Sequence, residues 1–155
     1  MKTRIISAFP GTGKTTYSLE HPDTAIDADT TAYDWVNGVM HGEHNPDFPN
    51  NYMEYVKENI GKVEFIFVPT HHVIRESLQS DGIHFYLVYP HGKERRRYIK
   101  RYRERGNSDK FVNDTIRVWS RELKECRNDR LGCTNIQMTE PFLSDVLVRI
   151  VNDDL

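Results

Sequence analysis

The hydrophobic positions of this chain fall into short apolar runs and into longer stretches where apolar and polar residues are mixed. A short apolar run bounded by Gly or Pro is typical of a buried strand, whereas apolar residues three or four positions apart indicate a helix. The runs predict strands at residues 4–8, 24–28, 63–68, 83–88 and 135–138. The mixed stretches predict helices at residues 14–20, 50–60, 72–79, 93–105, 109–127 and 141–151.

Strands and helices alternate along the whole chain, which is typical of a parallel sheet with helices on both faces. We therefore expect an α/β three-layer sandwich with a five-stranded parallel sheet. The 155 residues fit a single domain, residues 1–155. Residues 30–49 are the least regular part, and long loops inside compact domains are usually functional or mobile.

The first predicted strand runs into the segment Ala8-Phe9-Pro10-Gly11-Thr12-Gly13-Lys14-Thr15, which resembles a Walker A loop with Ala at its first position. A phosphate-binding loop needs a strand before it, small residues that turn backbone N–H groups inward, and a helix that begins at the anion. Lys14 is expected to reach the β- and γ-phosphates of ATP, and the Thr15 hydroxyl to ligate Mg²⁺. The expected ATP-binding residues are Pro10, Gly11, Thr12, Gly13, Lys14, Thr15 and Thr16.

Acidic residues separate the classes of protein that carry such a loop. An ATPase usually has an acidic residue at the end of the strand predicted at 63–68, but that strand ends in Val68-Pro69. The Asn-Lys-x-Asp signature of guanine recognition is also missing from the sequence. Both features argue against a motor and against a GTP-dependent switch.

Asp27 and Asp29 follow the second predicted strand. Strand carboxyl ends in a parallel sheet face the ligand crevice, and residues two apart point to the same side. We expect Asp27 to help hold Mg²⁺ and Asp29 to take a proton from an attacking hydroxyl. A turn and a helix cap are the alternative role for this pair.

A basic segment spans Lys93 to Arg105, where eight Lys or Arg residues stand against two Glu. Its charge of +6 leaves −8 for the rest of a chain whose net charge is −2, which indicates an anionic ligand held in one place. Arg97, Arg101 and Arg105 lie four residues apart, and the guanidinium fork suits phosphate oxygens. A merely exposed basic helix is one alternative. Contact with a nucleic-acid backbone, helped by the interleaved Tyr98 and Tyr102, is another.

Other side chains are candidates for binding the phosphate acceptor. His71 and Arg75 follow the third predicted strand and are spaced to share an anion; a structural helix start and a metal ligand are the alternatives for His71. Tyr33 and Trp35 lie in the irregular region and are candidates for stacking on a base.

These motifs together resemble the nucleoside monophosphate kinase class, and the Asp-x-Asp feature is similar to that of shikimate and gluconate kinases. The whole chain also resembles short phage-encoded proteins described as nucleotide kinases, through Ala8–Lys14, Tyr98–Gly106 and Leu143–Leu147. The Asp-Gly-x-Pro-Arg motif of adenylate kinases is missing from the sequence. The resemblance implies a P-loop NTPase fold of the kinase type with a short helical lid at about residues 91–108, on which Arg101 and Arg105 act. With Lys14 and Asp29, they are the expected catalytic residues.

The expected function is that of an ATP-dependent phosphotransferase that moves the γ-phosphate to a small nucleotide or nucleoside-like acceptor with Mg²⁺. Asp29, Tyr33, Trp35, His71, Arg75 and Arg97 are the expected acceptor-binding residues. Two alternatives stay open: a kinase of a non-nucleotide hydroxyl or of a modified base in DNA, and a nucleotide-binding regulatory module without turnover.

The sequence also bears on location and partners. It shows no secretory signal at its start and no apolar segment near the ~20 residues that cross a bilayer. Cys126 and Cys133 are expected to be unpaired thiols in a reducing compartment. We therefore predict a cytoplasmic protein without a membrane partner, and leave its oligomeric state open.

Overall fold

A computed structural model describes residues 1–153 and 155. Its centre is a five-stranded sheet with the strand order β2-β3-β1-β4-β5, in which every neighbouring pair is parallel. The strands are β1 (Arg4–Ala8), β2 (Ala25–Asp27), β3 (Phe65–Val68), β4 (Phe85–Pro90) and β5 (Cys133–Met138). The predicted five-stranded parallel sheet is confirmed.

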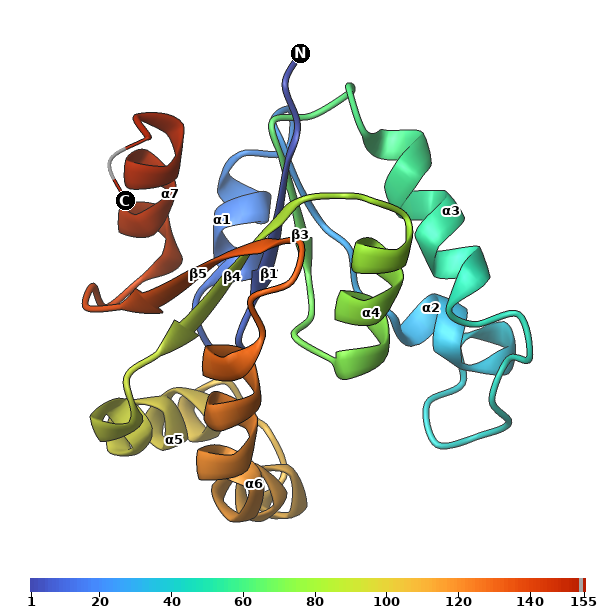
Figure 1. Ribbon diagram of the computed structural model, residues 1–155. Coiled ribbons are helices and arrows are strands. Elements are labelled where there is room, and N and C mark those ends of the chain that lie inside the picture. The colour runs from blue at the N-terminus through green and yellow to red at the C-terminus, as the bar shows by residue number, and fades with distance from the viewer. Residues whose placement is uncertain (154) are drawn as a thin grey trace.

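Helices cover both faces of the sheet (Figure 1). One face packs against α1 (Lys14–Glu20) and α7 (Leu143–Val151). The other face packs against α3 (Asn50–Asn59), α4 (His72–Ser80) and α6 (Asp109–Asn128). The predicted three-layer sandwich is therefore confirmed. Among the described residues, no helix has both the length and the apolar character needed to span a membrane.

The central strands are buried on both faces, which explains their continuous apolar runs. Ile5, Ile66 and Phe85 point toward the layer of α3, α4 and α6, whereas Ile6 and Phe67 point toward α1 and α7. Successive strand residues point to opposite faces, so a strand between two helical layers needs apolar side chains at nearly every position.

The region that the sequence left irregular contains α2 (Thr31–Asp34) and the 3₁₀ turn η1 (Val36–Gly38). The predicted basic helix is divided into the 3₁₀ turn η2 (Gly92–Glu94) and α5 (Arg95–Glu104). In Figure 1, α5, α6 and α2 lie toward the carboxyl ends of the strands.

The path of the chain creates a crevice at the carboxyl end of β1. From β1 the chain runs to β2 and β3 on one side, and later reaches β4 and β5 on the other. A strand at which the connections part in this way lies at a topological switch point, where ligands of open α/β sheets bind. The loop after β1, which the sequence marked for phosphate binding, lies at this point.

Candidate active site

The loop between β1 and α1 is turned as a phosphate-binding loop requires. Phe9 donates its backbone N–H to the carbonyl oxygen of Val88 at 2.9 Å, which fixes the start of the loop on β4. The buried Thr12 hydroxyl donates to the carbonyl oxygen of Phe9 at 2.9 Å. Gly11 and Gly13 have φ of 86° and 106°, a region that residues with a side chain rarely adopt. The two glycines are therefore conformational requirements of this loop.

Lys14, the first residue of α1, lies beneath this loop. Its Nζ donates to the carbonyl oxygen of Ala8 at 2.7 Å. Burial lowers the pKa of Lys14 to about 8, and the nearby Asp27 carboxylate opposes this shift. A largely protonated ammonium that has lost its water shell is strongly attracted to an anion, as the predicted contact with phosphate requires.

Thr15 and Asp27 come together as the sequence predicted. The Thr15 hydroxyl donates to Asp27 Oδ2 at 2.5 Å. Mg²⁺ prefers oxygen ligands, and beside nucleotide phosphates it is typically held by only one or two protein side chains. Within the described residues, no three His, Cys, Asp or Glu side chains converge on one point. The Thr15–Asp27 pair therefore fits a magnesium ion shared with phosphate oxygens rather than a metal cage.

Asp29 lies beside this pair and also organises the start of α2. Its Oδ1 accepts hydrogen bonds from the backbone N–H of Thr31 at 2.9 Å and from the Thr31 hydroxyl at 2.8 Å. The segment between the two aspartates is fixed by the buried Tyr52, whose hydroxyl donates to the carbonyl oxygen of Ala28 at 2.8 Å. Asp29 therefore does form the turn that was the alternative to a catalytic role, and it also borders the cavity.

The basic helix α5 packs on the phosphate loop through tyrosines. Tyr98 and Tyr102 are buried, and the Tyr102 hydroxyl donates to the carbonyl oxygen of Pro10 at 2.7 Å. A Cβ placed on Gly11 would lie 2.8 Å from Tyr102 Cε1. The idea that these tyrosines help to contact nucleic acid is therefore wrong, because their rings are used to seat α5 on the loop.

Two of the three arginines predicted to share one face of the helix border the cavity. Arg101 donates from Nη1 to the carbonyl oxygen of Gly11 at 2.9 Å and from Nη2 to that of Pro141 at 2.5 Å. Arg105 donates from Nε to Asn107 Oδ1 at 3.0 Å. Arg97 instead pairs with Glu94 at 2.7 Å and does not border the cavity.

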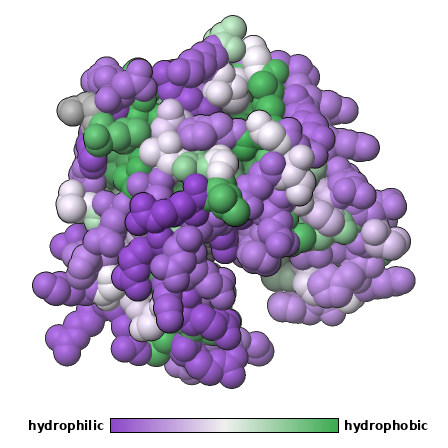
Figure 2. Space-filling model, in the orientation of Figure 1, coloured by the Kyte–Doolittle hydropathy of each residue, from purple (hydrophilic) through white to green (hydrophobic). Residues whose placement is uncertain are grey.

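These elements surround a cavity of about 490 Å³. Figure 2 shows the surface hollowed between the part formed by α5 and α6 and the part formed by α2 and α4, with hydrophilic residues around the hollow. The cavity is bordered by residues from the carboxyl ends of several strands: Pro10, Gly11, Gly13, Lys14, Thr15, Thr16, Asp27, Ala28, Asp29, Thr30, Pro69, His71, Arg101, Arg105, Phe111 and Phe142.

The residues predicted to bind the acceptor are only partly brought together. His71 borders the cavity with a substantial part of its surface exposed, and partial loss of hydration lowers the pKa of its imidazole. Tyr33 and Trp35 do not border it. The Tyr33 ring stacks on Tyr55 with centroids 5.2 Å apart, and the Trp35 ring stacks on His44 at 4.1 Å. These rings pack on neighbours within the chain, so the geometry does not support their stacking on a base.

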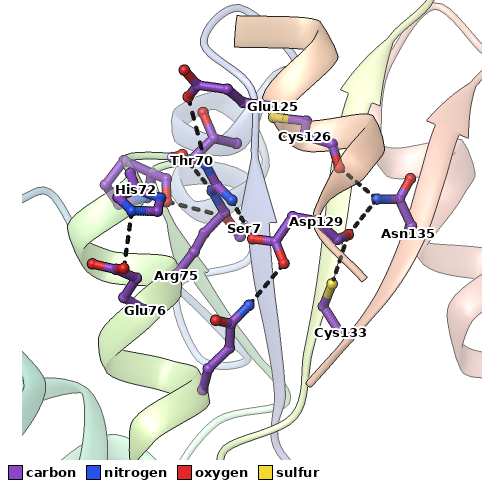
Figure 3. Close-up of polar contacts among 12 residues, drawn as sticks. Ser7, Thr70, His72, Arg75, Glu76, Glu125, Cys126, Asp129, Cys133 and Asn135 are labelled. Carbon is purple, nitrogen blue, oxygen red and sulfur yellow. Dashed lines mark hydrogen bonds and ion pairs between the residues drawn. The ribbon is translucent and has the colours of Figure 1, made fainter. Parts of the chain in front are cut away.

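Arg75 does not border the cavity, and Figure 3 shows it among Thr70, Glu125 and Asp129. Its buried guanidinium donates to the carbonyl oxygen of Thr70 at 3.0 Å, pairs with Asp129, and lies 3.8 Å from Glu125. The predicted acceptor contact of Arg75 is replaced by a link between α4 and the end of α6. The spacing of His71 and Arg75 could not reveal this, because Asp129 is 54 residues away in the sequence.

Five residues that border the cavity were not predicted as site residues from the sequence: Ala28, Thr30, Pro69, Phe111 and Phe142. Phe142 is half exposed and lies under the Arg101 guanidinium, 4.5 Å from ring centroid to Cζ. It follows β5 closely, and the carboxyl ends of parallel strands meet at the ligand edge. That rule was the available signal for Phe142, whereas Phe111 is placed by the packing of α6 against Tyr102.

The sheet order and the loop at its switch point define an α/β fold of the P-loop kinase type. Among solved structures, the chain is similar to a gluconokinase from Sinorhizobium meliloti 1021, with a TM-score of 0.55 over 98% of this chain and 94% of that chain. The two sequences are 13% identical, so this likeness concerns the fold. No protein-family model and no curated protein sequence matches the chain significantly, so the resemblance to phage-encoded kinases stays a prediction.

Proposed function

We propose that this protein is an ATP-dependent phosphotransferase that moves the γ-phosphate to a small nucleotide or nucleoside-like acceptor with the help of Mg²⁺. One observation carries this proposal: a single cavity contains a phosphate loop with its lysine, a pair of aspartates and two arginines. Phosphoryl transfer depends mainly on positioning and on charge stabilisation, which these groups supply together.

Each group has a role in this proposal. The N–H groups of the loop and Lys14 bind the ATP phosphates, and Arg101 and Arg105 stabilise charge on the transferred group. Thr15 and Asp27 hold Mg²⁺, which neutralises charge on the phosphate oxygens when it is bound. Residues 91–108 form the lid, since α5 packs directly on the loop through Tyr102.

Asp29 is the proposed general base. Its Oδ1 is fixed by Thr31, so the carboxylate has a defined orientation at the cavity wall. As Asp29 takes the hydroxyl proton of the acceptor, the hydroxyl oxygen forms a bond to the γ-phosphorus. The bond from that phosphorus to the bridging oxygen of the β-phosphate breaks, and ADP leaves.

A second candidate is a kinase of a non-nucleotide hydroxyl or of a modified base in DNA. Two observations favour it. A similar solved structure is that of a gluconokinase. The aromatic rings expected to stack on a nucleotide acceptor, Tyr33 and Trp35, do not border the cavity. A nucleotide-binding regulatory module is the conclusion left if ATP binds and no acceptor is phosphorylated.

The test is transfer of label from γ-labelled ATP to nucleosides, nucleotides, sugar acids and DNA with hydroxyl-bearing bases. We expect Lys14→Ala to lower transfer at least about a hundredfold, because the β- and γ-phosphates lose their ammonium partner. Lys124→Ala removes an exposed lysine on α6 and should have no effect. Full activity in a folded Lys14→Ala variant would contradict the mechanism.

We also propose that the protein acts in the cytoplasm. Cys126 and Cys133 are free thiols, as predicted, and free thiols suit a reducing compartment. Fractionation of cells that express the tagged chain tests this location.

A further inference from the structure

The charges around the cavity are divided between its two sides. The arginines Arg101 and Arg105 come from the segment that follows β4, and Phe142 follows β5. Asp27 and Asp29 come from the end of β2, and His71 follows β3. Because β2 and β3 lie on one side of β1 while β4 and β5 lie on the other, the phosphate loop separates a basic side from an acidic side.

The acidic side is where the acceptor must bind under the proposed function, because Asp29 is the base that meets its hydroxyl. The described residues that border the cavity on this side are Asp27, Ala28, Asp29, Thr30, Pro69 and His71, and none is Lys or Arg. The arginine of α4, Arg75, is buried and forms an ion pair with Asp129. Arg97 pairs with Glu94 outside the cavity.

His71 does not replace the missing cation. Partial loss of hydration lowers the pKa of its imidazole, an effect to which Lys14 adds and which Glu122, Asp34 and Asp29 oppose. Near pH 7 the ring is therefore neutral, and it offers a hydrogen bond without a positive charge. Thr30, a largely buried residue that also borders the cavity, adds a neutral hydroxyl.

The acidic side of the cavity would bind an anionic acceptor weakly. A monophosphate or a carboxylate would approach Asp29 with no Lys or Arg of this side to bind it, and like charges in a partly desolvated site repel strongly. Proteins that bind such groups usually provide Arg or Lys for them. A neutral hydroxyl can instead hydrogen-bond to Asp29, Thr30 and His71 without a charge penalty.

We infer that the acceptor presents an uncharged, hydroxyl-bearing group to Asp29, as a free nucleoside, a neutral alcohol or a hydroxyl-bearing base of DNA does, and that it is neither a nucleoside monophosphate nor a sugar acid. This inference rests on the proposed function and narrows its acceptor. Chemically, the reaction is the one given above, in which a hydroxyl oxygen forms the new bond to phosphorus and Asp29 takes the proton.

Acceptors matched in shape and different in charge test the inference. Initial rates from γ-labelled ATP would be measured for thymidine against thymidine 5′-monophosphate and for glucose against gluconate. A DNA duplex with a 5-hydroxymethyl pyrimidine would be compared with the same duplex without it. We expect kcat/KM for the best neutral acceptor to exceed that of its charged partner at least about tenfold. Transfer to the modified duplex alone would identify DNA as the source of the hydroxyl.

The outcomes separate this inference from the proposed function. If thymidine 5′-monophosphate or gluconate gives the highest kcat/KM, the enzyme is a kinase and the inference is overturned. If no acceptor is labelled although ATP binds, the proposed function is wrong, and the inference that rests on it is wrong as well. The wild-type protein decides between these results, so no variant has to fold.

A charge added at the acidic side provides an independent check. His71→Arg should raise kcat/KM for thymidine 5′-monophosphate relative to thymidine about tenfold, because a cation now faces the phosphate. His72→Arg is the matched control, since His72 pairs with Glu76 and does not border the cavity. An unchanged ratio in a folded His71→Arg variant would place the acceptor elsewhere and overturn the inference.

Discussion

At the scale of single residues, the cavity depends on side chains that serve structure and chemistry together. Asp29 holds the start of α2 through Thr31 and borders the cavity. Gly11 permits the turn of the phosphate loop and also leaves room for the Tyr102 ring. The sequence predicted both roles of Asp29 and the turn at Gly11, whereas the room that Gly11 leaves for Tyr102 depends on a neighbour far away in the chain.

Asp29→Asn separates the two roles of this side chain. Asparagine keeps a side-chain oxygen that can accept the hydrogen bonds from Thr31, but it cannot act as a base near pH 7. We expect transfer to fall by about 10²- to 10⁴-fold while ATP affinity changes little. Labelled-phosphate transfer and calorimetric titration with ATP would measure both effects. Asp23→Asn, at an exposed turn before β2, is the control; unchanged turnover in Asp29→Asn would remove Asp29 from the mechanism.

Gly11→Ala should lower the free energy of unfolding more than the same substitution at Gly61, a glycine of similar conformation. Gly11 has φ of 86° and Gly61 has φ of 90°, so alanine is strained by about 1–2 kcal/mol at both sites. Only at position 11 would the new Cβ meet side chains, at 2.8 Å from Tyr102 and 3.1 Å from Tyr98. Such overpacking adds about 1–3 kcal/mol to the loss of unfolding free energy.

Urea unfolding of Gly11→Ala and Gly61→Ala would measure this difference, and ATP titration would show whether the loop still binds. At position 61 no described atom lies within 4 Å of the added Cβ, which makes Gly61→Ala a control for backbone strain alone. Equal losses in the two variants would show that Tyr98 and Tyr102 do not constrain the loop.

At the scale of elements, α5 and α6 are fixed by long-range contacts. Arg101 and Tyr102 tie α5 to the phosphate loop. Arg75 and Asp129 tie α4 to the end of α6 (Figure 3). Gln79 donates to the other carboxylate oxygen of Asp129 at 2.8 Å. The helices themselves followed from the spacing of apolar residues, but which helix faces which could not be obtained from that spacing.

Asp129→Asn should destabilise the protein by about 3 kcal/mol. The Arg75 side chain is only 4% exposed and the Asp129 side chain 12%, so removing the carboxylate charge leaves a buried guanidinium without its main counter-charge. Glu125→Gln is the matched control, because the Glu125 side chain is 52% exposed and lies 3.8 Å from Arg75. An exposed pair of this kind contributes about 0–1 kcal/mol. Urea unfolding at neutral pH would compare the two, and equal losses would contradict the central role of Asp129.

At the scale of the whole molecule, apolar side chains fill the two layers between sheet and helices, while polar and charged groups gather at one edge of the sheet. The parallel sheet brings all its carboxyl ends to this edge, so that loops distant in the sequence form one cavity. This arrangement also buries titratable groups, and burial links the stability of the entire fold to pH.

His71 makes stability depend on pH in a predictable direction. Its pKa in the folded protein is lowered by burial, whereas the unfolded chain has the ordinary value near 6.5. Between these two values the unfolded state binds more protons, so stability falls as the pH drops through about 6.5 toward the folded pKa. His71→Gln removes this contribution, and the variant should gain stability relative to the wild type on acidification.

Urea unfolding of both proteins at pH 7.5 and pH 5.5 would test this linkage. His72→Gln, which changes the neighbouring histidine outside the cavity, is the control. A free-energy difference between wild type and His71→Gln that is the same at both pH values would contradict a lowered pKa of His71 in the folded protein.

The sequence by itself determined the five parallel strands, the phosphate loop with Lys14 and Thr15, and the Asp27–Asp29 pair. These features are local, because strand burial, loop conformation and side-chain spacing are written in adjacent residues. Only the tertiary structure decided that Arg75 is structural, that Tyr98 and Tyr102 seat α5, and that the acidic side of the cavity lacks a cation. The physical reason is that each of these facts depends on partners far away in the chain, such as Asp129 for Arg75 and Pro10 for Tyr102.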